Sequence, residues 1–364
     1  MDGDAAGPLC CGRCGGPAAA ARAARRQGFR AAVFARPGGD LSAAGTRTAR
    51  GARVGRAATP GWAATPGRAG GDGEAAGGAA HCRAVTGTLL DISPHILVVA
   101  TDAGQRRFAL TAGAAVWHGG TVQATELRPG ERVVARLAPG RKDVADKVWA
   151  GIGRVAGTIS ESGAGQLTVA EGTSRTQAVV IAPAAANRIR VRFPHLEPGN
   201  LIDVIGLRRG AVLEALIPAT SQPAYLASRL TRGPAVARTA AGTFSGSATW
   251  HEPAEPGEEP RGLAYPAIDP AAGCAEAALA APRPAELPYL AVGSMVSVRN
   301  ECTGAVRVLP VTGCGAAARL FHDRCLNCGT SPRGRVADLT LASFVELGGD
   351  PERACFNATI TVRP

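Results

Sequence analysis

The sequence lacks long hydrophobic runs. No stretch of its 364 residues reaches the roughly 18 uninterrupted apolar residues that a membrane helix needs, because Arg, Gly, Pro or Asp interrupts each run. We therefore expect no transmembrane segment.

Aromatic residues and lysine are also scarce. Aromatics make up 4% of the chain, and only two Lys, Lys142 and Lys147, accompany 38 Arg. The net charge of +11 would suit a nucleic-acid partner. However, 12 of the Arg fall in residues 1–83, and no basic stripe is interleaved with aromatic side chains on which bases stack. Because the excess of Arg, Ala, Gly and Pro is typical of GC-rich coding DNA, we expect no nucleic-acid partner.

Cysteine is absent between Cys82 and Cys274, and six cysteines then crowd the last 91 residues. An even number in a small loop-rich region predicts a disulfide framework and an extracellular or cell-envelope location, although no export signal is recognisable in the N-terminal head. Reduced thiols or a zinc site are the alternatives. Cys325-Leu-Asn-Cys328 has zinc-site spacing, but no second CxxC or HxxxH lies at the expected distance from it, so we expect no metal. The candidate disulfide cysteines are Cys274, Cys302, Cys314, Cys325, Cys328 and Cys355.

Composition divides the chain into five parts. Residues 1–82 alternate Ala, Gly, Arg and Pro clusters without any apolar period, which predicts a disordered head. Residues 83–152 and 153–220 are rich in short β-branched runs, residues 221–241 form a Pro- and Ala-containing linker, and residues 242–364 form the last domain.

Residues 83–220 repeat one pattern. The Gly-Thr pairs that begin at Gly87 and Gly157 are 70 residues apart, and Leu127-Arg-Pro-Gly and Leu196-Glu-Pro-Gly are 69 apart. This spacing predicts two copies of one small β-barrel, each closed after a turn. The pattern resembles the small oligonucleotide/oligosaccharide-binding-like barrels of bacterial envelope proteins. In the two repeats of this chain, the following His and Asp residues are expected at turns or on the surface: His95, His118, His195, Asp91, Asp143, Asp146 and Asp203.

Residues 242–364 read mostly as alternating strands. The exception is 339–347, where the apolar spacing predicts one short helix that ends at Gly348. A single helix in a strand-rich domain indicates a closed barrel with a helical crossover. The predicted fold class is mainly β, with two small barrel repeats followed by a six-stranded double-psi β-barrel with a short helix.

The motifs of this last domain resemble those of a known group. Ser-Ala-Thr-Trp ending at Trp250, Val-Gly-Ser-Met-Val-Ser-Val-Arg-Asn ending at Asn300, Asp323-Arg-Cys-x-x-Cys and Ala-Asp338-Leu-Thr-x-x-Ser-Phe-x-x-Leu-Gly occur in this order. Together they resemble the double-psi β-barrel of the rare lipoprotein A, expansin and barwin-like group, across residues 242–364. The resemblance implies a secreted module that binds or cuts cell-wall polysaccharide along a groove.

The resemblance places two carboxyl groups in that groove. Asp338 would act as a general acid that protonates the glycosidic oxygen, and Asp323 would be a second groove carboxylate. If the two met, repulsion between like charges would raise one pKa. The alternative for Asp338 is capping of a helix that begins near Leu339. The alternative for Asp323 is an ion pair with Arg324.

Five other residues are candidates for substrate binding. Trp250 and Tyr289 offer rings on which sugars stack, and His251, His322 and Thr249 offer hydrogen bonds. The alternatives are a core-filling role for Trp250 and a structural role for Thr249. No cofactor is expected.

Three functions follow from the resemblance. The first is a secreted protein that binds or remodels peptidoglycan or another wall glycan. The second is a peptidoglycan lytic transglycosylase that uses Asp338, and the third is a protein-binding module of barwin or kiwellin type. Where wall-cleaving members carry Trp-Tyr-Gly, this chain has Trp250-His251-Glu252. That departure favours binding over cleavage. The oligomeric state is not indicated.

Overall fold

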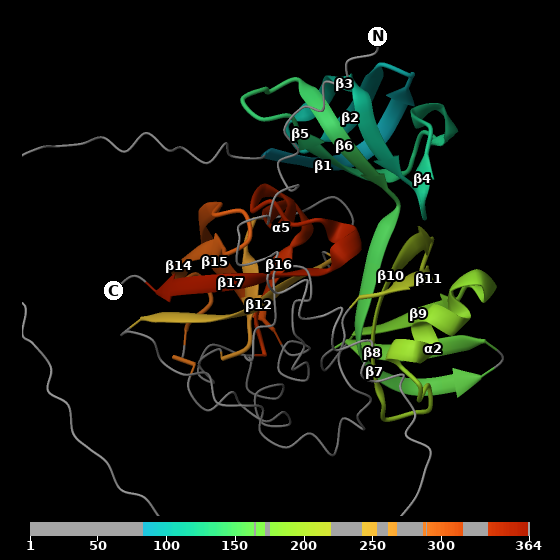
Figure 1. Cartoon of the computed structure of the whole chain (residues 1–364), viewed down its shortest axis with the longest axis vertical. Coiled ribbons are helices and arrows are strands. Elements are labelled where there is room, and N and C mark those ends of the chain that lie inside the picture. The colour runs from blue at the N-terminus through green and yellow to red at the C-terminus, as the bar shows by residue number, and fades with distance from the viewer. Residues whose placement is uncertain are drawn as a thin grey trace, which may run out of the picture. The chain divides into compact units, whose positions relative to one another are not determined.

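The strands that the structure describes form three β-barrels in sequence order (Figure 1). The structure is a computed structural model that describes residues 83–163, 165–171, 175–219, 242–252, 261–267, 287–288, 290–315 and 334–362. The predicted mainly β class, with several small barrels and a short helix, is confirmed. The predicted head, 1–82, and the predicted linker, 221–241, lie outside the described residues.

The first barrel contains strands β1 to β6, and hydrogen bonds connect them in the order β2-β1-β5-β6-β3-β4. An additional pairing between β2 and β3 closes the ring of longer strands. Its elements are β1 (Arg83–Ile92), β2 (Ile96–Thr101), β3 (Gly104–Trp117), β4 (Thr121–Val122), the 3-10 turn η1 (Ala124–Glu126), β5 (Arg132–Leu137) and β6 (Val144–Ala150).

The second barrel closes in the order β10-β11-β9-β8-β7. The two rings match strand for strand, with β7, β8, β9, β10 and β11 taking the places of β1, β2, β3, β5 and β6. In both, the third strand runs parallel to the last, as β3 pairs with β6 and β9 with β11. The elements are β7 (Ile152–Gly163), β8 (Gln166–Glu171), β9 (Arg175–Ile181), η2 (Pro183–Ala185), α2 (Ala186–Arg192), β10 (Leu201–Arg209) and β11 (Val212–Pro218).

The repeated glycines occupy equivalent places in the two barrels. A Cβ on Gly87 would lie 2.0 Å from the carbonyl oxygen of Ala100, and a Cβ on Gly157 would lie 2.1 Å from that of Ala170. Only glycine fits this close approach of the backbone. The Leu-x-Pro-Gly turns are equivalent as well: Gly130 has φ +91° and Gly199 has φ +90°. The 70-residue repeat in the sequence thus reflects two copies of one backbone constraint.

Each repeat has one more long strand than the sequence pattern suggested. Strands β6 and β11 were not predicted, and neither was helix α2. The reason for β6 is its mixed pattern, Val-Ala-Asp-Lys-Val-Trp-Ala, in which Asp146 and Lys147 interrupt the apolar alternation. Asp146 is neutralised there by an ion pair with Arg136 across the strands, 2.8 Å from Nε to Oδ1. Long-range pairing therefore overrides the local pattern.

The third barrel closes in the order β12-β16-β13-β15-β14-β17. Two of its pairings are parallel, β12 with β16 and β13 with β15, and the remaining ones are antiparallel. Its elements are β12 (Thr243–His251), β13 (Leu263–Tyr265), β14 (Met295–Asn300), β15 (Val306–Cys314), β16 (Arg335–Thr340), α5 (Leu341–Glu346), η5 (Pro351–Arg353) and β17 (Cys355–Val362).

The predicted helix is shorter than expected. Helix α5 begins at Leu341 rather than near Leu339, because Leu339 belongs to β16 and pairs with both Trp250 and Leu263. Thr340 takes the N-cap position, and Gly348, with φ +77°, ends the helix as predicted. The whole of β16 and α5 is buried, so apolar spacing alone did not separate strand from helix.

The described residues fall within one compact unit of the chain. One hydrophobic cluster includes residues of all three barrels, such as Trp149, Ile205 and Phe344. Polar contacts between barrels accompany it, among them Trp149 Nε1 donating to Glu352 at 3.0 Å. None of the helices among the described residues is long and apolar enough to span a membrane.

Candidate functional site

Two parallel strands of the third barrel carry the predicted site residues that the structure describes. Strand β12 holds Thr249 and His251, and strand β16 holds Asp338. In the register of the pair, Thr249 lies opposite Asp338 and His251 opposite Thr340. Because β16 lies between β12 and β13 in the barrel wall, both of its edges are paired and its residues are all buried.

Asp338 accepts a hydrogen bond inside the protein. Thr249 Oγ1 donates to Asp338 Oδ1 at 2.7 Å, and Asp338 is only 7% exposed. Burial alone would raise the pKa of this carboxyl group. The charges of His251, Arg335 and Arg154 and the hydroxyl of Thr249 outweigh burial and lower the pKa below its usual value.

This environment differs from that of a general acid. A general acid must carry a proton before the reaction, which normally requires a raised pKa. Asp338 instead remains a carboxylate at neutral pH. The alternative interpretation, that Asp338 caps a helix, is wrong: the helix begins three residues later and Thr340 occupies the cap position. The carboxylate is therefore available to hold Thr249 and to balance nearby positive charge.

His251 is the member of this group that reaches toward solvent. Its side chain is partly exposed, unlike those of Thr249 and Trp250. Its Nδ1 atom is buried, and no hydrogen bond to that atom is found among the described residues. His251 also interacts electrostatically with Asp338.

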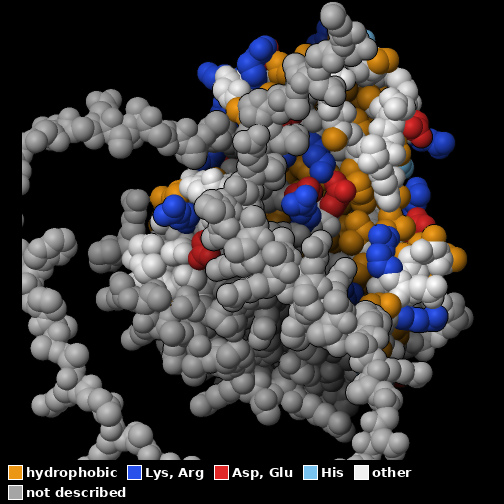
Figure 2. Space-filling model, in the orientation of Figure 1, with side chains coloured by type: hydrophobic (Ala, Val, Ile, Leu, Met, Phe, Trp, Pro, Cys, Tyr) orange, Lys and Arg blue, Asp and Glu red, His pale blue; other side chains and the backbone are white. Residues whose placement is uncertain are grey.

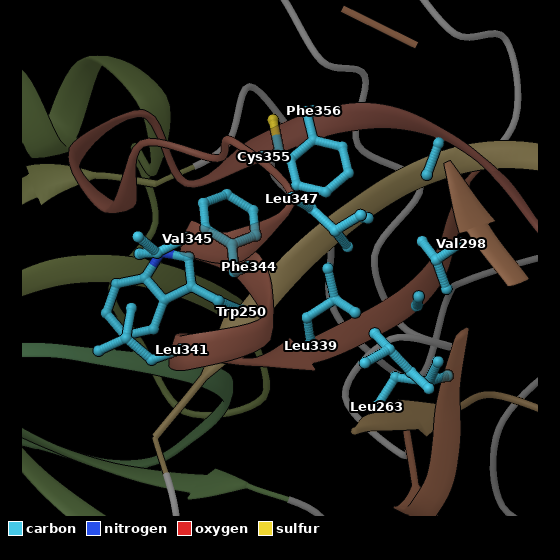
Figure 3. Packing of buried hydrophobic residues seen from close by; sticks show 14 of the residues in the cluster. Trp250, Leu263, Val298, Leu339, Leu341, Phe344, Val345, Leu347, Cys355 and Phe356 are labelled. Carbon is cyan, nitrogen blue, oxygen red and sulfur yellow. The ribbon is translucent and has the colours of Figure 1, made fainter. Parts of the chain in front are cut away.

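Trp250 is a core residue. Its side chain is 0% exposed, and its Nε1 donates to the carbonyl oxygen of Pro351 at 3.1 Å. Figure 3 shows the indole beside Leu341 and Val345 of α5. The sequence left two roles open for Trp250, and the burial favours core filling over stacking on a sugar, because both ring faces are packed.

The other candidates are not brought together with Asp338 in the described part of the chain. Tyr289, His322 and Asp323 lie outside the described residues, so a meeting of Asp323 with Asp338 stays a prediction. Cys274, Cys325 and Cys328 also lie outside them. Cys302, Cys314 and Cys355 are described, and Cys302 and Cys314 are both disulfide-bonded.

A buried ionic cluster adjoins the site, and its members come from the second barrel as well as the third. Asp203 of β10 is 0% exposed and lies between Arg154 of β7 and Arg335 of β16. Glu252, which follows β12, accepts a hydrogen bond from the backbone nitrogen of Arg154 at 2.7 Å. The expectation that Asp203 is a turn or surface residue is wrong.

Sequence reasoning missed this cluster for a physical reason. Asp203 stands among apolar residues in Leu-Ile-Asp-Val-Ile, and both of its partners are far away in the chain, at 49 and 132 residues. An acidic residue inside an apolar run indicates a buried, paired charge. That signal shows that a partner exists, but it does not identify the partner.

Surface charge offers no comparable concentration on the face shown in Figure 2. There the described Lys and Arg side chains are scattered among acidic and hydrophobic ones. Among the described residues, no group of three or more His, Cys, Asp and Glu side chains is arranged to hold a metal ion.

No protein-family model matches the sequence, and a search of curated proteins finds no match. The resemblance to the rare lipoprotein A, expansin and barwin-like group therefore rests on the motifs of residues 242–364.

Proposed function

We propose that the protein is a secreted cell-wall protein whose third barrel binds peptidoglycan or another wall glycan without cleaving it. The observation that carries this proposal is the state of Asp338. The motif resemblance puts a carboxyl group at this step of the barrel, and here the group is an ionised hydrogen-bond acceptor of Thr249. Such a group orients its neighbours but has no proton to donate.

His251 is the proposed contact for the glycan. It lies two residues after Thr249 on the same strand, so both side chains project from the same side of β12. An imidazole ring donates a hydrogen bond from its N–H group. Sugar hydroxyls and wall carboxylates are acceptors that suit such a donor.

The test compares binding and cleavage in one preparation. The purified full chain is mixed with insoluble peptidoglycan sacculi, the bound fraction is sedimented, and the soluble fraction is examined by mass spectrometry for anhydro-muropeptides. We expect the wild-type chain to sediment with the sacculi and to release no anhydro-muropeptides. We expect His251→Ala to reduce the bound fraction, whereas His195→Ala, at an exposed turn of the second barrel, leaves it unchanged.

Two outcomes contradict the proposal. Release of anhydro-muropeptides by the wild type, abolished by Asp338→Asn, would instead identify a lytic transglycosylase. Absence of both binding and release would favour the protein-binding alternative of barwin or kiwellin type.

Secretion and the disulfide framework belong to the same proposal. They rest on the six cysteines in the last 91 residues. Mass spectrometry of unreduced proteolytic peptides is expected to recover cross-linked pairs among these six. Recovery of six reduced thiols from protein purified without reductant would contradict the proposed compartment.

A further inference from the structure

Asp203 binds two guanidinium groups from two different barrels. Arg154 donates to it twice, from Nε to Oδ1 at 2.8 Å and from Nη2 to Oδ2 at 2.6 Å. Arg335 donates from Nη2 to Oδ2 at 2.7 Å. The two carboxylate oxygens thus receive three charge-assisted hydrogen bonds in a site closed to solvent.

The two arginines connect Asp203 to the two strands of the candidate site. Arg335 is the first residue of β16, the strand that carries Asp338. Arg154 Nη1 donates at 2.6 Å to the carbonyl oxygen of Trp250, which lies between Thr249 and His251 on β12. Asp203 is therefore connected to each of the two strands through one arginine.

A second connection fixes the end of β12. Glu252 accepts from the backbone nitrogen of Arg154 at 2.7 Å, and Arg208 Nε of β10 donates to its Oε2, also at 2.7 Å. The backbone on either side of His251 is thereby held by the second barrel, at Trp250 on one side and at Glu252 on the other. His251 therefore lies between two residues that contact the second barrel.

Stability alone is a weak reason for this arrangement. Buried ion pairs often contribute no more to the free energy of unfolding than apolar side chains of the same volume, because burial removes the hydration of each charge. An apolar replacement, however, would neither hold a carbonyl oxygen of β12 nor place positive charge near Asp338. The position of the charges relative to the site is what distinguishes this cluster from ordinary packing.

We propose that the second barrel completes the site of the third: Arg154, held by Asp203, is a positioning residue that fixes β12 around His251 and supplies positive charge near Asp338. The functional unit is then the pair of barrels rather than the third barrel alone. The inference rests on the proposed function only for its ligand, because the titration of Asp338 can be followed without any glycan.

The experiment uses the full chain with two variants and a matched control. Arg154→Met removes the charge and keeps a long side chain, and Arg154→Lys keeps the charge without the bidentate fork. The control is Lys147→Met. Lys147 of the first barrel also forms ion pairs with the third barrel, at 2.7 Å to Glu352 and 3.3 Å to Asp350, away from Asp338.

Two readouts separate positioning from mere support. The first is the titration midpoint of Asp338, followed by carboxyl-carbon NMR and assigned with Asp338→Asn. The second is retention on peptidoglycan sacculi. We expect Arg154→Met to move the midpoint to higher pH and to reduce retention by about fivefold or more. Arg154→Lys is expected to keep the Asp338 midpoint close to its wild-type value but to keep only part of the retention on sacculi. Lys147→Met is expected to change neither the midpoint nor the retention.

The inference is overturned if Arg154→Met leaves the Asp338 midpoint where it is in the wild type, or if Lys147→Met moves it equally. If the wild type does not bind sacculi, the proposed function fails, and the titration still decides the inference. Should Arg154→Met not fold, Arg154→Lys carries the test, because an unchanged midpoint with full retention of sacculi would contradict any need for the fork.

Discussion

Asp203 and Arg335 form an ion pair between two barrels, with 2.7 Å from Oδ2 to Nη2 and both side chains 0% exposed. Their residues are 132 positions apart in the chain. Because Arg154 binds the same carboxylate, one negative charge is shared by two positive ones. The loss of Asp203 would therefore leave two buried guanidinium groups without the carboxylate that binds both.

This imbalance makes Asp203→Asn the most damaging single polar substitution that we predict. The free energy of unfolding should fall by about 3 to 5 kcal/mol, because buried charges are stranded. Urea unfolding followed by tryptophan fluorescence measures it. The control is Asp143→Asn, whose ion pair with Arg141 is mostly exposed and should contribute less than about 1 kcal/mol. Similar losses for the two variants would show that the buried cluster is not tightly paired.

Gly157→Ala tests the backbone constraint that the repeat preserves. Its new Cβ would lie 2.1 Å from the carbonyl oxygen of Ala170, so strands β7 and β8 must separate locally. We expect a loss of about 1 to 3 kcal/mol in the free energy of unfolding, as for overpacking in a core. Gly163→Ala, at a position with no heavy atom within 4 Å, is the control and should be nearly neutral. Equal effects would contradict the interpretation of the repeat.

The repeated glycines also show what the sequence predicts well. Gly87 and Gly157 are visible as a spacing because each satisfies a local constraint that any copy of the unit must satisfy. Strand β11 and helix α2 left no such mark. Strand β11 pairs with its hairpin neighbour β10 and also with β9, from which η2, α2 and β10 separate it in the chain. A seven-residue helix is stabilised mainly by the surface that it covers.

Trp250 provides a test of the core interpretation. Trp250→Ala should lower the free energy of unfolding by about 3 to 5 kcal/mol, because it leaves a large cavity beside α5. Val191→Ala, on α2 and 80% exposed, should change it by less than about 0.5 kcal/mol. Urea unfolding again gives the values. A Trp250→Ala variant with wild-type stability and no affinity for sacculi would restore the stacking role.

The candidate site was only partly predictable, and the reason is the direction of side chains. The motifs named Asp338 and Thr249 as separate candidates, and only the structure places them opposite each other on β16 and β12. The motifs did not show that Trp250 faces the core, since alternate residues of a strand point to opposite sides and the sequence does not say which side is open. Arg154 belongs to a different barrel, so no motif of the third one could include it.

Glu171 makes the stability depend on pH. Burial is the main cause that raises its pKa from 4.5 to about 7, and the charge of Glu252 adds to it, while Arg175, Arg208 and the backbone N–H of Ala156 act in the opposite direction. The folded protein therefore binds this proton more tightly than the unfolded chain does. Between pH 4.5 and 7 the folded state holds more protons at this site, so its contribution to stability falls as pH rises.

The measurement is the difference in free energy of unfolding between Glu171→Gln and the wild type at several pH values. The amide side chain of this variant cannot ionise, so the variant should gain on the wild type by roughly 3 kcal/mol between pH 4.5 and about pH 7 and by little more above about pH 8. Glu161→Gln, at an exposed carboxylate of the same barrel, supplies the matched control. A difference that stays constant with pH, or one that shrinks as pH rises, would mean that Glu171 is solvated or is held in its charged form by Arg175.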